Sequence, residues 1–179
     1  MKQKIVYFMF AVLLSTLLFA CGVGKKQYDV AMQLSQSGKN LEAIAYLEQA
    51  IEKEPSNKKY RQALTGLKKE LIAEYVAEGE KALSVDGAQT ISAINIAKTK
   101  LAMAQDVDAN STVVKQFEDK LKLAEDALVA DVGQLYATAK SAMDEGDWLQ
   151  AQFSLQQVQS RFPGFEDSMQ WLSKATHEA

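Results

Sequence analysis

Few residues in this 179-residue chain have the type and spacing that chemistry requires. Glu74 and Glu78 are four residues apart, which places two carboxylates on one face of a predicted helix, as a hydrolase or a small-ligand site could use. The same spacing is more typical of a surface pair. The only histidine, His177, lies near the carboxyl end, where exposed side chains are usual. We therefore expect no enzymatic activity and no bound cofactor.

Residues 106–110 have the opening pattern of a calcium loop. Asp106, Asp108 and Asn110 alternate as the first oxygen ligands of an EF-hand do. The remainder of that loop is missing, because Ser111 stands in place of the turn glycine and Phe117 in place of the bidentate glutamate. We interpret residues 106–110 as a polar loop whose side chains cap the next helix, and we predict no metal site.

Basic side chains cluster between positions 58 and 69. The cluster consists of Lys58, Lys59, Arg61, Lys68 and Lys69. Such a cluster can contact the phosphate groups of lipids near a membrane anchor. Because two acids follow it immediately, at positions 70 and 74, a solvated helical face is the preferred interpretation.

The amino-terminal segment ends on the only cysteine of the chain, Cys21. Lys2 and Lys4 give it a positive start, and positions 5–20 form a nearly unbroken apolar run. This run is shorter than the roughly 20 residues of a membrane-spanning helix. The pattern is that of a secretory signal peptide.

The sequence Leu-Phe-Ala-Cys-Gly at positions 18–22 resembles the lipobox of bacterial lipoproteins. The resemblance implies that the signal peptide, residues 1–20, is removed and that Cys21 carries several acyl chains, palmitate among them. Several chains anchor a protein stably, whereas one holds it only marginally. Since Gly22 and not an aspartate follows, the resemblance implies lipid anchoring at the periplasmic face of the outer membrane. An ordinary signal-peptide residue or an uncleaved anchor helix is the alternative interpretation of Cys21.

Composition narrows the classes of partner. Removal of residues 1–20 takes away two of the 20 basic residues and none of the 23 acidic ones, which leaves a formal charge of −5. A mildly acidic chain argues against binding to nucleic acid. Once Cys21 is acylated, the chain has no thiol for a disulfide, so its stability must come from packing.

Helix-forming residues dominate the body of the chain, and only Pro55 and Pro163 interrupt it. The apolar spacing predicts helices over about 25–37, 39–53, 57–85, 91–104, 111–145 and 148–161, and a last one after position 165. The helix over 39–53 is predicted to pack through one face, which contains Leu41, Ile44, Leu47 and Ile51. In the helix over 57–85, the glycines at positions 66 and 79 each lower the stability of the helix by about 1 kcal/mol relative to alanine, unless close packing compensates.

An internal repeat relates the two ends of the chain, and the two copies align at one constant spacing without a gap. The matching pairs are Tyr28 and Tyr136, Ala31 and Ala139, Gly38 and Gly146, Leu41 and Leu149, Ala43 and Ala151, Leu47 and Leu155, and Pro55 and Pro163. Each copy reads as a helix, a turn on glycine, a second helix with small residues, and a closing proline.

This pattern resembles the tetratricopeptide (TPR) repeat, in which small side chains let two antiparallel helices approach closely. A degenerate middle copy lies near positions 75–97. The resemblance implies an all-α, TPR-like right-handed superhelix of antiparallel helix hairpins joined by long helices. It would cover residues 27–178, after the lipidated cysteine and a short linker, residues 21–26.

In that family, first-helix residues that face the concave side bind partner peptides. The equivalent residues here are Tyr28, Met32 and Ser35 in the first copy, and Tyr136, Lys140 and Met143 in the last. Val76 and Glu80 are the middle equivalents. Tyrosine and methionine suit adaptable peptide binding, but a helical stripe of this kind equally suits packing against a neighbouring helix.

These features together predict a non-catalytic, membrane-anchored periplasmic TPR-like scaffold lipoprotein. Its partners would be envelope proteins or peptides, in the assembly of an envelope or secretion complex. The alternative is an adaptor or regulator of a peptidoglycan-processing enzyme.

Overall fold

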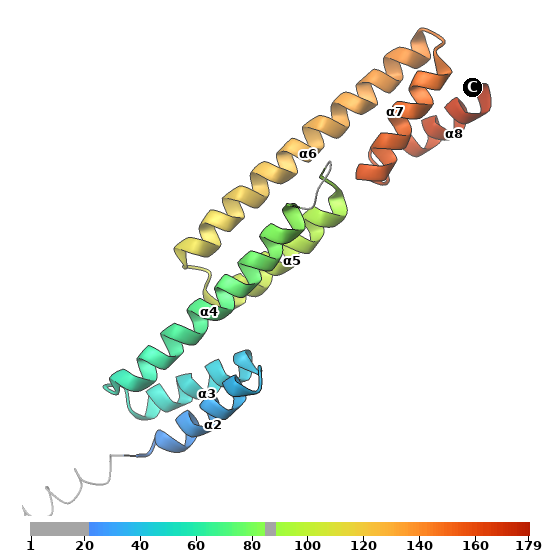
Figure 1. Cartoon of the computed structure of the whole chain (residues 1–179). Helices are drawn as coiled ribbons and strands as arrows, with labels where there is room; N and C mark the ends of the chain where they lie inside the picture. The colour runs from blue at the N-terminus through green and yellow to red at the C-terminus, as the bar shows by residue number, and fades with distance from the viewer. Residues whose placement is uncertain (1–21, 85–88) are drawn as a thin grey trace, which may run out of the picture. The chain divides into compact units, whose positions relative to one another are not determined.

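The computed structural model describes residues 22–84 and 89–179, and over these ranges its elements are all α-helices, joined by turns (Figure 1). The all-α prediction is confirmed. The helices are α2 (Lys25–Gln36), α3 (Asn40–Lys53), α4 (Lys58–Leu83), α5 (Ile91–Asp108), α6 (Thr112–Asp144), α7 (Trp148–Arg161) and α8 (Ser168–Glu178). The predicted signal peptide and the predicted lipidation site, Cys21, lie outside the described residues, as does Asp86-Gly87, a dipeptide typical of a turn.

The chain divides into two compact units whose boundary falls within α4. Unit 1 ends at Leu71 and contains α2, α3 and the first half of α4. Unit 2 begins at Ile72 and contains the rest of α4 and helices α5 to α8.

Small residues bring the helices of unit 1 together. Ala31 of α2 and Ala43 and Ala50 of α3 have no exposed surface, and Leu47 is 1% exposed. Alanine at a helix crossing lets the two backbones approach, and the large aliphatic side chain then fills the remaining space. The helices α2 and α3 therefore form a closely packed hairpin.

The turn between α2 and α3 depends on Gly38, whose φ of +78° is unfavourable for a residue with a Cβ atom. Its amide donates to the carbonyl of Ser35 at 3.0 Å, and the amide of Lys39 donates to that of Leu34 at 2.9 Å. These two bonds form a Schellman motif, which satisfies carbonyls at the end of α2.

The equivalent turn in unit 2, between α6 and α7, has the same geometry. Gly146 has a φ of +79°, and its amide donates to the carbonyl of Met143 at 3.1 Å. The amide of Asp147 donates to the carbonyl of Ala142 at 2.8 Å, and the Asp147 carboxylate then caps α7 by accepting from the amide of Gln150 at 3.0 Å. Both copies of the sequence repeat therefore form the same glycine-terminated helical hairpin.

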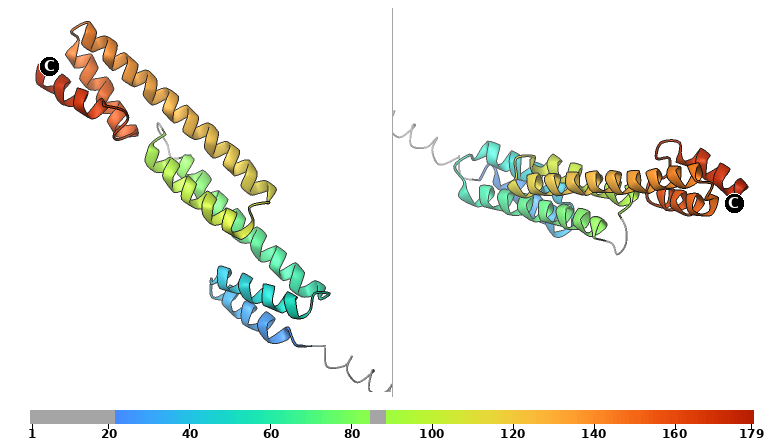
Figure 2. Two further views of the ribbon diagram at one scale, coloured as in Figure 1. Left: turned by 180° about the vertical axis from the view of Figure 1, so that it is seen from behind. Right: turned by 90° about the horizontal axis from the view of Figure 1, so that it is seen from above.

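In unit 2 the long helix α6 contacts α5 along its first half and α7 along its second half, as Figures 1 and 2 show. An ion pair between Lys98 and Glu125 joins α5 to α6 at 2.6 Å. Further along α6, Asp131 pairs with Arg161, the last residue of α7, at 3.2 Å. α6 is thus the helix against which both α5 and α7 pack.

Two local predictions are wrong. Residues 106–108 are not part of a loop, because α5 continues to Asp108 and buries Val107; the turn is confined to 109–110. The carboxylate of Asp108 accepts from the amide of Asn110 at 2.9 Å, while the side chain of Ser111 makes no capping bond to α6. Leu41 does not pack with the core of unit 1, since it is 55% exposed.

Candidate protein-interaction surface

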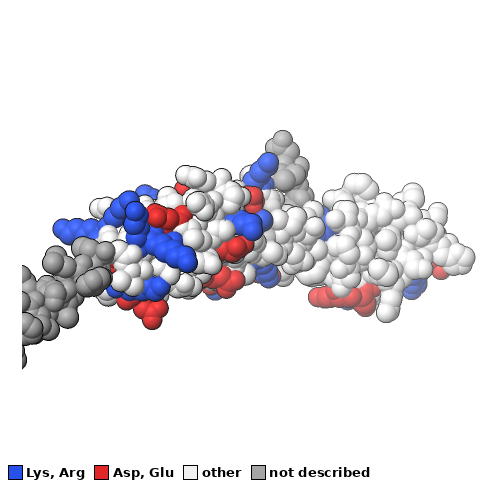
Figure 3. Space-filling view, turned by 90° about the horizontal axis from the view of Figure 1, so that it is seen from below, with Lys and Arg blue, Asp and Glu red and all other residues white. Residues whose placement is uncertain are grey.

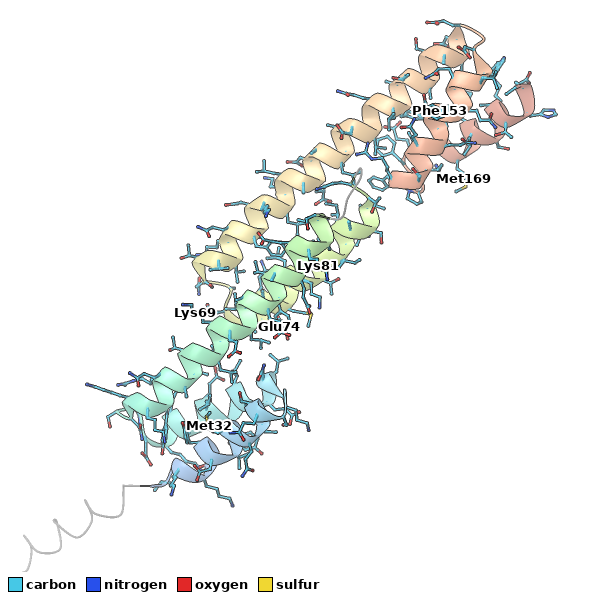
Figure 4. The ribbon with its side chains drawn as sticks, in the orientation of Figure 1. Met32, Lys69, Glu74, Lys81, Phe153 and Met169 are labelled. Atoms are coloured by element: carbon cyan, nitrogen blue, oxygen red, sulfur yellow. The ribbon has the colours of Figure 1, made fainter. Side chains whose placement is uncertain are left out.

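The residues predicted to line a groove in unit 1 lie on one side of α2 and are all half-buried. Tyr28 stacks on Tyr60 of α4, with ring centroids 4.9 Å apart and an interplanar angle of 22°. The ammonium of Lys59 lies 4.4 Å from the centre of the Tyr28 ring. Tyr28 thus packs against α4, while Met32 (Figure 4) and Ser35 remain partly accessible.

In unit 2, the predicted groove residues lie on the last turns of α6. Tyr136 is 6% exposed, and its ring meets that of Phe165 edge-on at 5.9 Å. The ammonium of Lys140 lies 5.5 Å from the centre of the Tyr136 ring, and Met143 is half-buried. Like Tyr28, Tyr136 packs against residues that follow its hairpin, which is one of the two interpretations that the sequence left open.

The two middle equivalents do not form a binding surface in unit 2. Val76 is buried, and Glu80 pairs with Lys120 of α6 at 2.7 Å. The groove residues of the two ends belong to separate units, so the structure brings together three residues in each unit.

A polar cluster holds α8 against the hairpin of unit 2. The hydroxyl of Tyr136 donates to one oxygen of Asp167, and the indole N–H of Trp171 donates to the other at 2.8 Å. The hydrogen bond to Asp167, with burial, raises the pKa of Tyr136 to about 12. The bond from Tyr136, followed by that from Trp171 and the charge of Lys140, lowers the pKa of Asp167.

We predict that Tyr136→Phe lowers the free energy of unfolding by about 1–2 kcal/mol at neutral pH, because Asp167 loses a charge-assisted hydrogen bond. The raised pKa of Tyr136 means that its contribution is complete below its ordinary value of 10.0 and is lost as the pH rises through about 12. The lowered pKa of Asp167 means that its contribution is complete above 3.8 and is lost as the pH falls below that value.

Urea unfolding of both proteins, followed by circular dichroism across this pH range, measures the difference. It should be constant between about pH 5 and pH 9 and should shrink toward both extremes. A difference that is the same at every pH would mean that only the shape of the side chain matters.

The clearest exposed apolar feature of unit 2 lies on α7. Leu149 is 69% exposed and Phe153 is 58% exposed, and the two are one helical turn apart. They lie on the side of α7 opposite to Ala151 and Leu155, which are fully buried. We call Leu149 and Phe153 the apolar ridge; Figure 4 labels Phe153 on it.

The apolar ridge has a partial counterpart in unit 1. Leu41, at the position equivalent to Leu149, is also largely exposed. Both leucines belong to the matching pairs of the internal repeat, and their exposure was not predicted from the sequence. For unit 2, the helical period could have predicted this exposure, since Leu149 and Phe153 lie opposite to the small and aliphatic residues through which α7 packs.

No protein-family model matches this chain, and neither a curated protein nor a solved structure matches it.

The residues considered for catalysis do not converge. Glu78 forms an ion pair with Lys100 of α5, and Glu74 (Figure 4) is exposed on α4. The hydrogen bond from Lys100 to Glu78 raises the pKa of Lys100, and the charge of Glu74 adds to this shift. His177 is exposed in the last turn of α8. Lys100 therefore neutralises one member of the acid pair, Glu78.

The described residues contain neither a cluster of metal-ligating side chains nor a helix that could span a membrane. Over residues 22–84 and 89–179, no three histidine, cysteine or acidic side chains come together as metal ligands. None of the helices in these ranges combines the length and the apolar character of a membrane-spanning helix. The predicted lipidation at Cys21 lies outside the described residues and stays a prediction.

Proposed function

We propose that this chain is a non-catalytic scaffold, anchored by lipid at the periplasmic face of the outer membrane. Its TPR-like helical hairpins would hold envelope proteins or peptides while an envelope or secretion complex assembles. The lipobox-like sequence that ends at Cys21 supports the anchor. The repeated hairpin, with nearly identical glycine turns at Gly38 and Gly146, supports a repeat scaffold.

The observation that carries the proposal is the apolar ridge. Two large apolar side chains one turn apart, each more than half exposed, cost solvation free energy that a partner could recover. A ridge on a helix fits an apolar groove, or the apolar face of an amphipathic helix. Leu41, exposed at the equivalent place in unit 1, offers a second contact of the same kind.

The first experiment is affinity purification of the lipidated protein from detergent-solubilised envelopes, followed by mass spectrometry, with Cys21→Ser as the unanchored control. We expect one envelope or secretion component to be recovered in stoichiometric amount from the anchored form only. Recovery of a peptidoglycan hydrolase from both forms would move the proposal to an adaptor of that enzyme. Recovery of no partner at all would contradict the scaffold.

We predict that Leu149→Asp combined with Phe153→Asp lowers recovery of the partner by about 30-fold or more, as expected when the central apolar contacts of an interface are lost. Both side chains are exposed, so the fold should be retained, which circular dichroism checks. Leu123→Asp is the matched control, because Leu123 of α6 is 71% exposed and lies outside the ridge. Equal losses with the ridge variant and with the control would rule out the ridge as the contact.

A further inference from the structure

One end of unit 1 gathers basic side chains from three helices. The start of α2, the end of α3 and the start of α4 meet there, because Tyr28 stacks on Tyr60 and the amide of Gly24 donates to the carboxylate of Glu54 at 2.9 Å. The basic residues at these three helix ends are Lys25, Lys26, Lys53, Lys58, Lys59 and Arg61. We call this set the basic end; all six side chains are exposed.

The charge of the basic end is not neutralised by ion pairs. Within residues 22–84 and 89–179, none of its six side chains pairs with a carboxylate, whereas Lys68 further along α4 pairs with Glu48 at 2.8 Å. Arg61 donates to the carbonyl of Pro55, and Lys59 lies over the ring of Tyr28. Figure 3 shows basic side chains gathered near the start of the described chain, with some acidic side chains beside them.

A carboxylate at this end of unit 1, that of Glu54, is used by the backbone. It accepts from the amides of Gly22 at 3.1 Å and Gly24 at 2.9 Å, and from the side chain of Asn57 at 3.0 Å. The bond from Asn57 and then that from Gly24 lower the pKa of Glu54, so the carboxylate stays charged while it holds the start of the described chain.

This contact fixes where the chain enters unit 1. Gly22 follows Cys21 directly, and the Cα atoms of neighbouring residues are only about 3.8 Å apart. An acyl anchor on Cys21 would therefore leave the protein beside the basic end. A membrane that receives the anchor would then meet six exposed cationic side chains at the depth of its lipid phosphates.

We propose that the basic end of unit 1 binds the phosphates of an anionic lipid surface and forms a second attachment beside the anchor. The orientation rests on the proposed function, because it assumes acylation at Cys21. The binding itself depends only on the six basic residues. The basic cluster between positions 58 and 69 thus has two parts. Lys68 lies on a solvated face and pairs with an acid, whereas the basic residues near position 58 belong to the proposed membrane contact.

The test uses a chain that begins at residue 21, with Cys21→Ser, so that no acyl chain contributes. It is sedimented with vesicles containing equal parts of phosphatidylglycerol and phosphatidylethanolamine, and with vesicles of phosphatidylcholine alone. We expect binding to the anionic vesicles only, and unchanged binding when inorganic phosphate is added at millimolar concentration. Equal binding to both vesicles, binding to neither, or displacement by free phosphate would overturn the proposal.

A triple variant tests whether the basic end is the surface that binds the vesicles. Lys25→Gln, Lys26→Gln and Lys58→Gln together should weaken vesicle binding on the order of 100-fold, since each lysine near an anionic surface contributes roughly fivefold. The matched control removes the same charge from three exposed lysines of unit 2: Lys81→Gln, Lys115→Gln and Lys122→Gln. An equal loss in both triple variants would show a general charge effect and would overturn the assignment.

The two proposals fail separately in these experiments. The vesicle assay contains no lipidated cysteine, so it reports on the basic end alone. The mass of the mature amino terminus, measured on protein from envelopes, reports on acylation of Cys21 alone. Acylated protein whose basic end does not bind would leave the anchor proposal standing and remove the second attachment.

Discussion

Phe117→Ala is expected to lower the free energy of unfolding by about 3–5 kcal/mol. Phe117 of α6 is 2% exposed and, among the described residues, is the largest side chain that is buried to this degree. Its ring lies against the backbone of α4 at Gly79, so truncation leaves a cavity that neither helix can fill with its own side chains. Because natural domains have about 5–15 kcal/mol of stability, the loss is a large share of the total.

Chemical denaturation followed by circular dichroism measures this effect, with Leu123→Ala as the control on the same helix. Leu123 is 71% exposed, so its truncation should change the midpoint little. A Phe117→Ala protein as stable as the control would mean that α4 and α6 are not packed through this ring.

Gly79→Ala is expected to destabilise the protein by about 1–3 kcal/mol, although alanine is the better helix former. A Cβ atom at position 79 would overlap the ring of Phe117, lying 2.8 Å from its Cε1 atom, and would lie 3.3 Å from Cβ of Lys100. Phe117 is buried, so its ring has little room to move away. Gly79 is therefore the contact point that allows α4 and α6 to approach each other closely.

Gly66→Ala supplies the matched control on the same helix, because a Cβ atom there meets nothing within 4 Å. It should stabilise the protein by up to about 1 kcal/mol through helix propensity alone. Thermal unfolding of both variants should thus shift in opposite directions. A further variant that combines Gly79→Ala with Phe117→Leu should recover part of the loss, since the smaller side chain leaves space for the new methyl group. Shifts of the same sign for both glycines would contradict this account of the packing.

Local signals in the sequence were sufficient to predict the helices, and for α3 and α7 also their ends. The bounds of α3 and α7 follow from a glycine before each helix and a proline after it, at Gly38 and Pro55 and again at Gly146 and Pro163. These signals act through the backbone of a few consecutive residues, so they need no knowledge of distant contacts. The internal repeat was visible for the same reason, and both of its glycine turns have the same geometry.

Local signals did not predict which residues are buried and which are exposed. Leu41 has the type of a core residue and is exposed, and Val107 was assigned to a loop and is buried in α5. Periodicity places a residue on a side of its helix, but only the neighbouring helix determines whether that side is covered. The groove candidates of each unit lie on one side of a helix, which follows from their spacing. The packing of Tyr28 and Tyr136 depends instead on aromatic rings much further along the chain.

The amino-acid pattern alone was enough to predict an all-helical chain and its glycine turns, and it contains the repeat and the lipobox-like segment that ends at Cys21. Tertiary packing was needed to show that Gly79 is a tight contact and Gly66 an open one, and that α7 exposes an apolar ridge. It also brought Lys25 and Lys58, which are distant in the sequence, to the same end of unit 1. The reason is that helix formation uses interactions between residues close in the sequence, whereas burial and surface charge depend on which helices pack side by side.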